Sequence, residues 1–293
     1  MKNELRMLSF RVLLLVIMTG FLASSCTQVY FEKPVPQNAA EMQLIPADWT
    51  GVYQAQSVGA EDPSLLEQLF QQCFRLERLN ESRLLVASEY RLHEKDIPRL
   101  RNALDEQKTS GDLLDYELSE NMILCTVAGE DGSTEQQYTA LLKKGPWYIL
   151  TQTIAPVQLF DLKSGNKMNF DLKTSASMSS PWLPGADSIS SEQATLVARQ
   201  TRKHWYFNTW EANAKKWSLL YVEQTSKDQL LIKQSHLQNP EAFKMRLDYF
   251  NRITPFREVD SDNFEIDPTD EALEQLLAEK DMFQTTYLRR IEE

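Results

Sequence analysis

The sequence lacks any apolar stretch long enough to cross a bilayer as a helix. Its longest run of apolar and small side chains covers residues 12–23, whereas a membrane-spanning helix needs about 20 such residues. No later stretch approaches that length. The sequence therefore predicts no spanning helix in the chain that follows the first 25 residues.

Positive charge is also scarce. The 293 residues contain 31 Lys and Arg against 42 Asp and Glu, which gives a formal net charge of −11. The first 25 residues contribute +2, from Lys2, Arg6 and Arg11 against Glu4, so the remainder carries −13. Phosphate backbones and anionic membrane surfaces repel so acidic a body. We therefore expect no nucleic-acid partner.

Motifs for common catalytic and metal chemistry are missing. The chain contains no G-x-S-x-G, Walker or G-x-G-x-x-G pattern, which removes support for esterase, nucleotide and dinucleotide sites. His93, His204 and His236 are the only histidines, and their spacing matches no zinc-binding pattern. We predict neither a metal centre nor a cofactor, and we assign no catalytic residue.

A partial match to penicillin-acylated serine enzymes uses common residues at unsuitable positions. Ser164 and Lys167 fit S-x-x-K, and an S-D-N string begins at Ser261. That chemistry needs the serine at the start of a buried helix, whereas the Gly-Asn pair after Ser164 predicts a hairpin tip. The K-T-G element that should come last is absent there, so we do not favour this enzyme class.

An acidic segment near the C-terminus partly fits a calcium loop. Asp260, Asp262 and Glu271 occupy the first, third and twelfth positions of the EF-hand spacing. Glu265 stands where the loop needs glycine. A solvated acidic loop that leads into a helix explains the same residues through the helix dipole, so we expect at most weak, adventitious calcium binding.

Cysteine occurs three times, as Cys26, Cys73 and Cys125. Cys73 and Cys125 lie in strand-like stretches and can form a disulfide in an oxidising compartment. Alternatively, they are separate buried thiols that act as small hydrophobic side chains. A redox pair is not predicted, because the C-x-x-C spacing is absent. The sequence leaves the first two alternatives open.

The first 25 residues have the three parts of a secretory signal peptide. A basic start is followed by the apolar residues 12–23 and then by Ser24 and Ser25. Small side chains at Ala23 and Ser25 would let a general signal peptidase cut after Ser25. The run from Ala23 to Cys26 also resembles the lipobox of bacterial lipoproteins, although Ala23 replaces the commoner leucine. That resemblance implies that Cys26 is alkylated with diacylglycerol and becomes the new N-terminus.

Turn signals and apolar patterns divide the chain into five segments. Residues 1–25 are the signal peptide, which is removed, and residues 26–46, with three prolines, are an extended tether. Residues 47–173 are predicted to form an N-terminal β-rich α+β region. Residues 174–192 are dense in Ser, Pro and Gly and are predicted to be a linker or long loop. Residues 193–293 are predicted to form a C-terminal α+β region.

The predicted fold class is therefore α+β, mostly antiparallel sheet with a few helices. Residues 204–237 are predicted to form a three-stranded meander, followed by helices near residues 240–253 and 268–280. Residues 76–92 and 222–238 share a strand, turn, strand layout, and a predicted helix follows each. This parallel favours two similar α+β halves.

Tryptophans offer a signal for ligand binding. Trp205, Trp210 and Trp217 lie in the meander, and Trp182 lies between two prolines of the linker. Strand alternation places Trp205 on one face and Trp210 on the other, which is typical of a sheet covered by core on both faces. The alternative is that these four tryptophans contact a glycan, peptide or lipid.

Three parts of the chain together resemble uncharacterised outer-membrane lipoproteins of the Bacteroidetes kind. They are the lipobox-like start, the segment VYFEKPVP and the ending IDPTDEALEQLL…TTYLRRI. The resemblance implies a lipid anchor in the cell envelope, and Thr27 after the cysteine implies sorting to the outer membrane.

Two functional hypotheses follow. The first is a non-catalytic binding or structural module, held to the membrane by its N-terminal lipid, with an envelope protein or a glycan as partner. The second is a periplasmic or surface hydrolase with an unrecognised active site. It requires acids such as Asp260 and Asp262 to converge in a cleft with perturbed pKa values.

Overall fold

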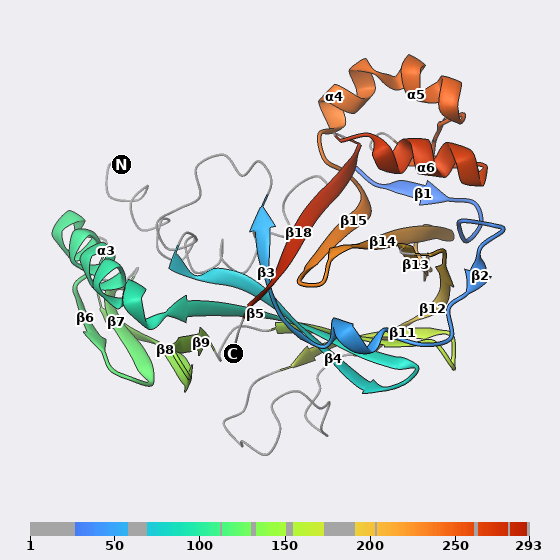
Figure 1. Cartoon of the computed structure of the whole chain (residues 1–293). Helices are drawn as coiled ribbons and strands as arrows, with labels where there is room; N and C mark the ends of the chain where they lie inside the picture. The colour runs from blue at the N-terminus through green and yellow to red at the C-terminus, as the bar shows by residue number, and fades with distance from the viewer. Residues whose placement is uncertain are drawn as a thin grey trace.

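The computed structural model describes residues 27–57, 69–111, 113–129, 133–150, 155–172, 191–202, 204–260, 263–280 and 282–291. Strands run through most of this part of the chain, and the helices gather at two separate places on its periphery (Figure 1).

Antiparallel strands close into a ten-stranded barrel. Its strands are β3 (Gly51–Ser57), β4 (Gln71–Asn80), β5 (Arg83–His93), β10 (Ala155–Asp161), β11 (Asn166–Leu172), β12 (Ser191–Gln200), β13 (His204–Glu211), β14 (Lys216–Ser226), β15 (Gln229–Leu237) and β18 (Phe283–Ile291). Around the ring the order is β14, β13, β12, β11, β10, β5, β4, β3, β18, β15 and β14 again. Closure joins the two ends of the folded chain, because Val52 of β3 pairs with Ile291 of β18.

The fold is therefore largely all-β, and the predicted α+β class is wrong. Residues 47–173 supply β3, β4, β5, β10 and β11, while β12 to β15 and β18 come from residues 191–291, so the two predicted halves share one barrel. A local pattern identifies a strand but not its partner, and pairs such as Arg83 with Asp161 join distant segments. Residues 173–190, most of the predicted linker, lie outside the described residues.

The predicted meander over residues 204–237 is confirmed. β13, β14 and β15 pair in sequence as antiparallel neighbours. Alternation also places aromatic side chains on both faces of β13. Trp205 and Phe207 belong to the cluster inside the barrel, whereas Tyr206 belongs to a second cluster outside it.

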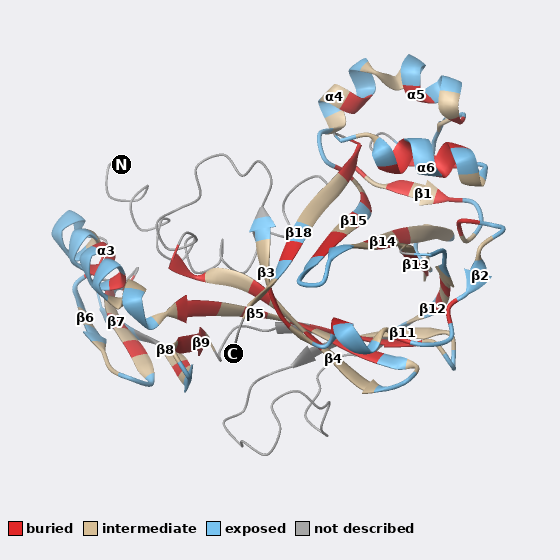
Figure 2. Cartoon of the chain, in the orientation of Figure 1, coloured by how far each residue is buried: buried red, intermediate tan, exposed pale blue. Residues whose placement is uncertain are grey.

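A helical lobe covers one outer side of the barrel. It comprises β1 (Val29–Phe31), α4 (Pro240–Met245), α5 (Leu247–Ile253), β16 (Arg257–Glu258), β17 (Phe264–Ile266) and α6 (Asp270–Ala278). Side-chain caps start two of the helices, because Asn239 accepts from the backbone N–H of Ala242 and Thr269 from that of Ala272. The buried residues of α4, α5 and α6 lie on the sides that face the sheet (Figure 2).

A second extension lies at the opposite end of the molecule. It comprises η2 (Glu94–Asp96), α3 (Ile97–Ser110), β6 (Asp115–Leu118), β7 (Met122–Ala128), β8 (Thr134–Lys144) and β9 (Trp147–Leu150). Leu100, Ala103 and Leu104 are buried on one face of α3. Gly111 ends the helix with φ of 84°, in the left-handed region that suits glycine.

The segment predicted to be a tether is part of the folded body over residues 27–49. β1 pairs in parallel with β17, β2 (Ala40–Glu41) pairs with β12, and η1 (Ala47–Trp49) follows. Val29, Phe31 and Val35 are each exposed by 1% or less. A strand of three residues carries too short a pattern to be recognised, and its partner lies more than two hundred residues away, so the sequence does not reveal this docking.

Candidate functional site

The interior of the barrel holds a cavity. Its volume is about 130 Å³, and it opens to solvent. The inward side chains of an eight-stranded barrel just fill its interior. A ten-stranded barrel is wider, so it leaves more room.

Trp49 lines the cavity and packs deep inside the barrel. Its side chain is 1% exposed. Its ring centroid lies 4.8 Å from that of Trp205, edge to face, and 6.2 Å from that of Phe207. The indole Nε1 is buried and has no hydrogen-bond acceptor among the described residues. The short helix η1 therefore places the ring of Trp49 inside the barrel, with an N–H donor that no acceptor among the described residues satisfies. We call the Trp49 side chain the plug.

Arg290 of β18 holds the backbone around this plug. Its guanidinium donates to the carbonyl oxygens of Asp48 and Thr50, the latter at 3.1 Å, and to the Tyr53 hydroxyl at 2.7 Å. The guanidinium carbon also lies 5.3 Å from the centre of the Tyr53 ring. Burial raises the pKa of Tyr53, and the nearby Arg290 opposes that shift. The plug is thus fixed on both sides, at residues 48 and 50.

The cavity changes from apolar to polar along the strands. Leu230 and Leu288 face each other across β15 and β18, and Gln234 and Gln284 are opposite each other four residues along. At about 3.4 Å per residue, the two levels are about 14 Å apart along the strand. The side chains with amide or hydroxyl groups in the lining are Gln72, Gln158, Gln234, Gln284 and Thr286. Gln158 and Thr286 pair with the apolar Val86 and Ile232, so we reserve the name amide rim for Gln72, Gln234 and Gln284. No charged or titratable side chain occurs in the described lining.

Four inward-facing apolar side chains of the cavity are only half-buried. Phe74, Val86, Leu220 and Ile232 line the cavity, yet each keeps intermediate exposure. Solvent therefore reaches apolar surface inside the barrel. A barrel filled by its own side chains would bury these groups completely.

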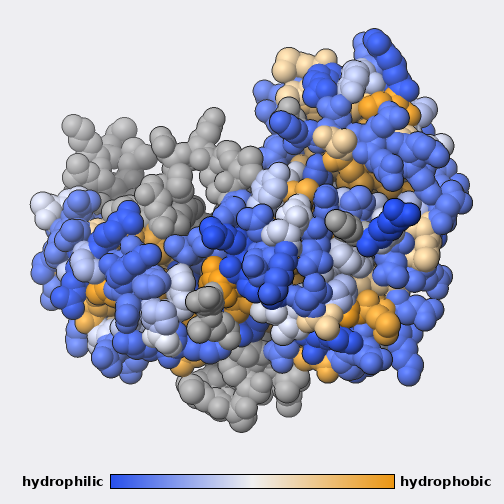
Figure 3. Space-filling model, viewed as in Figure 1, coloured by the Kyte–Doolittle hydropathy of each residue, from blue (hydrophilic) through white to orange (hydrophobic). Residues whose placement is uncertain are grey.

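The outer surface has a different character. In the view of Figure 3 the described surface is mostly hydrophilic, with small and scattered hydrophobic areas. Isolated apolar side chains on a surface are normal and indicate no binding site. The accessible apolar lining of the barrel is therefore the stronger candidate for a ligand site.

The structure does not bring the four predicted ligand tryptophans together. Trp205 packs against Trp49 inside the barrel. Trp210 and Trp217 form an edge-to-face pair with centroids 5.3 Å apart, next to the turn that joins β13 to β14. Trp182 lies outside the described residues. Two-sided packing of aromatics therefore explains Trp205 without any ligand.

Sequence reasoning missed the amide rim and the plug. Two of the rim glutamines occur two residues from an inward apolar side chain in the same strand, Gln72 from Phe74 and Gln234 from Ile232. That spacing is the only local signal. It becomes informative once the strand partners show which face is the interior.

Cys73 and Cys125 are free thiols, so of the two alternatives that the sequence leaves open, separate thiols are correct and a disulfide is not. Cys73 lies in β4 and is 0% exposed, whereas Cys125 lies in β7 and packs in the cluster beside α3. Burial raises the pKa of Cys73 to about 12 and that of Cys125 to about 11. Both therefore act as small buried hydrophobic residues.

The remaining sequence motifs do not form a site among the described residues. Ser164 lies in the turn between β10 and β11, where its backbone N–H donates to Asp161, which confirms the hairpin tip. Asp260 accepts from the backbone and side chain of Asn263, and Asp262 lies outside the described residues. No group of His, Cys, Asp and Glu in the described part of the chain is arranged to hold a metal ion.

The three histidines occupy separate places. His93 accepts from the backbone N–H of Lys95 at the start of η2. His204 lies against Tyr221, with ring centroids 5.4 Å apart. Burial lowers the pKa of His236 in β15.

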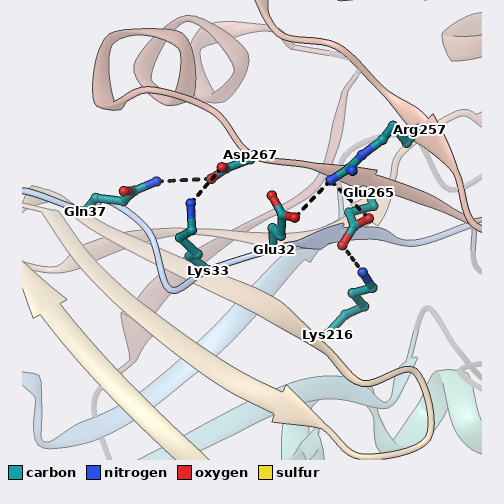
Figure 4. A network of polar contacts seen from close by, with 7 residues as sticks. All are labelled: Glu32, Lys33, Gln37, Lys216, Arg257, Glu265 and Asp267. Carbon is teal, nitrogen blue, oxygen red and sulfur yellow. Dashed lines mark hydrogen bonds and ion pairs between the residues drawn. The ribbon is translucent and has the colours of Figure 1, made fainter.

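Polar contacts hold the N-terminal segment to the helical lobe (Figure 4). Glu265 of β17 accepts from Lys216 of β14, and Arg257 lies 3.3 Å from Glu265 and 3.3 Å from Glu32. Glu265 is only 6% exposed, so water screens its pair with Lys216 poorly, whereas Arg257 and Glu32 are both exposed and their pair is screened.

A second set of contacts in Figure 4 fixes the chain after β1. Lys33 donates to Asp267 at 2.9 Å, and the Gln37 side chain donates to the same carboxylate at 3.1 Å. The backbone N–H groups of Gln37 and Asn38 donate to Asp270 at the start of α6. The first described residues are thus fastened at several points.

Comparisons with known proteins identify no relative: no family model, curated protein or solved structure matches this chain. None of the helices in the described part of the chain has the length and apolar character needed to cross a membrane.

Proposed function

We propose that the protein is a lipid-anchored protein of the bacterial cell envelope, in the outer membrane, whose barrel binds an apolar or amphipathic small molecule. The interior cavity is the observation that carries this proposal. It offers half-buried apolar side chains, an open mouth and a small number of polar groups, the usual composition of a small-molecule site. A glycan suits it poorly, because its many hydroxyl groups would lose their hydration against apolar walls.

Binding fits this cavity better than hydrolysis does. General acid and base catalysis needs a titratable side chain within reach of the substrate. The described lining offers amides, one hydroxyl and one indole N–H as its polar groups. We therefore retain the non-catalytic hypothesis and do not propose a hydrolase.

The start of the folded body supports a close attachment to the membrane. Cys26 directly precedes Thr27, and consecutive Cα atoms lie about 3.8 Å apart. Thr27 is 2% exposed, and its carbonyl accepts from the backbone N–H of Leu237 at 2.8 Å. A lipid on Cys26 would therefore hold the body at the end of β15, close to the start of α4. A diacylglycerol plus an amide-linked chain anchors stably, whereas one chain binds only marginally.

Mass spectrometry of the mature N-terminus tests the anchor. We expect wild type to begin at a lipid-modified Cys26 and to fractionate with membranes, whereas Cys26→Ser is released in soluble form. Cys73→Ser is the matched control, since that thiol is buried, and it should remain in the membrane fraction. An unmodified N-terminus at residue 26 would contradict the lipid anchor but not ligand binding.

Extraction of the purified protein tests the cavity. We expect organic solvent to release a small apolar or amphipathic molecule from protein that was isolated without detergent. The Cys26→Ser chain serves here, because its lack of an anchor removes the need for detergent. Native protein that carries no such molecule and binds no neutral hydrophobic dye would contradict the binding function.

A further inference from the structure

We infer that the preferred ligand is an uncharged amphipath with one apolar chain, whose head group is hydrogen-bonded by the amide rim. This inference rests on the proposed binding function and adds the chemical class of the ligand. Its basis is the arrangement of polar groups at one end of the cavity.

The apolar level of the cavity suits a hydrocarbon chain. Leu230 and Leu288 are 2% and 1% exposed, and Phe160 and Leu84, which pair across β10 and β5, belong to the same buried cluster. Above them, Ile232 and Val86 remain half-buried. A chain that lies along these side chains removes its own surface and theirs from water, which is the main driving force for binding.

The amide rim lies where the head group of such a molecule would be. Gln234 and Gln284 are directly opposite each other in β15 and β18, and Gln72 comes from β4, so three strands contribute to the rim. Each amide offers both a donor and an acceptor. Hydroxyl and amide head groups match this chemistry, because they too are uncharged and can both accept and donate, and an ester group can accept from the glutamine NH₂ groups.

A charged head group lacks a partner at this rim. The described lining contains no Lys or Arg to pair with a carboxylate, and no Asp or Glu to pair with an ammonium group. Moving an ion from water to a site without a counter-charge carries a large desolvation cost. The net charge of −13 after the first 25 residues further disfavours anions. The cavity should therefore discriminate among amphipaths by head-group charge.

Three probes with the same chain length test this inference. Titration calorimetry of the Cys26→Ser chain would compare monolauroylglycerol, laurate and dodecyltrimethylammonium below their micellar concentrations. We expect monolauroylglycerol to bind at least about tenfold more tightly than either ion, a difference that calorimetry resolves easily. Equal affinity for all three, or tighter binding of an ion, would overturn the head-group inference and leave the binding function standing.

Two variants locate the binding. Thr286→Phe fills the cavity from β18, whereas Tyr287→Phe makes the same final side chain at the adjacent, outward and 41% exposed position. We expect Thr286→Phe to weaken monolauroylglycerol at least about tenfold and Tyr287→Phe to leave it unchanged. Equal effects of the two variants would place the ligand outside the cavity and overturn the inference.

A third variant tests the rim itself. Gln284→Lys adds a cation at the rim, so laurate affinity should rise at least about tenfold while monolauroylglycerol affinity changes much less. No gain for laurate would mean that the head group does not lie at the rim. If none of the three probes binds the Cys26→Ser chain and the neutral dye Nile red does not bind it either, the proposed binding function fails together with this inference.

Discussion

Removal of the aromatic plug should destabilise the barrel. Truncation of a buried tryptophan to alanine costs about 3–5 kcal/mol. Trp49 is 1% exposed and has edge contact with Trp205, and it also lines the cavity, so truncation would enlarge a space that already exists. We therefore expect Trp49→Ala to lower the free energy of unfolding by about 3 kcal/mol, the lower end of that range.

Urea unfolding of the Cys26→Ser chain, followed by circular dichroism, measures this loss by linear extrapolation. The melting temperature should fall by about 5–10 °C. Trp210→Ala is the matched control, because Trp210 is half-buried on the outer face and should cost about 1 kcal/mol. If Trp49→Ala cost no more than Trp210→Ala, the plug would not be packed as the structure describes, and the reasoning would be refuted.

Three further predictions concern buried polar groups. Glu89→Gln should lower the free energy of unfolding, measured in urea, by about 3–5 kcal/mol, because it removes the carboxylate that pairs with the fully buried guanidinium of Arg91. The control Glu77→Gln should cost less than about 0.5 kcal/mol. Burial lowers the pKa of His236 below its usual 6.5, so the unfolded chain binds the proton more readily than the folded chain. The free energy of unfolding should therefore fall as the pH drops below 6.5 through the lowered pKa. Urea titrations at a series of pH values should show this dependence, and His236→Gln should flatten it. Cys73 and Cys125, with raised pKa values and full burial, should react with a thiol reagent at neutral pH only after denaturation; rapid labelling of the native chain would contradict their placement.

The sequence predicts local elements well where turn chemistry and alternation agree. The meander over residues 204–237, the hairpin tip at Ser164 and the helices near residues 240–253 and 268–280 are all present. Each depends on residues within a few positions of one another. Such short-range rules determine where a strand begins and ends, and which side chains share a face.

The closed barrel depends on information that no local pattern carries. β5 pairs with β10, and β3 pairs with β18, across long separations in the chain. Without these pairs, Gln234 looks like any solvent-facing strand residue, and Val29 looks like part of a proline-containing spacer. The amide rim and the docked N-terminal segment were therefore beyond prediction, because both arise from partners that the chain meets only after folding.

Closure between β3 and β18 also has a consequence for how this protein is made. β18 is the last strand, and it comprises nine residues, Phe283–Ile291. A chain that emerges N-terminus first cannot complete the ring until this strand is present, and contacts between distant segments form slowly. Until then β3 and β15 expose open edges that invite pairing with other chains. The pairing of residues 283–291 thus separates a loose chain from the closed barrel, and a truncated product that lacks this strand would be prone to aggregation.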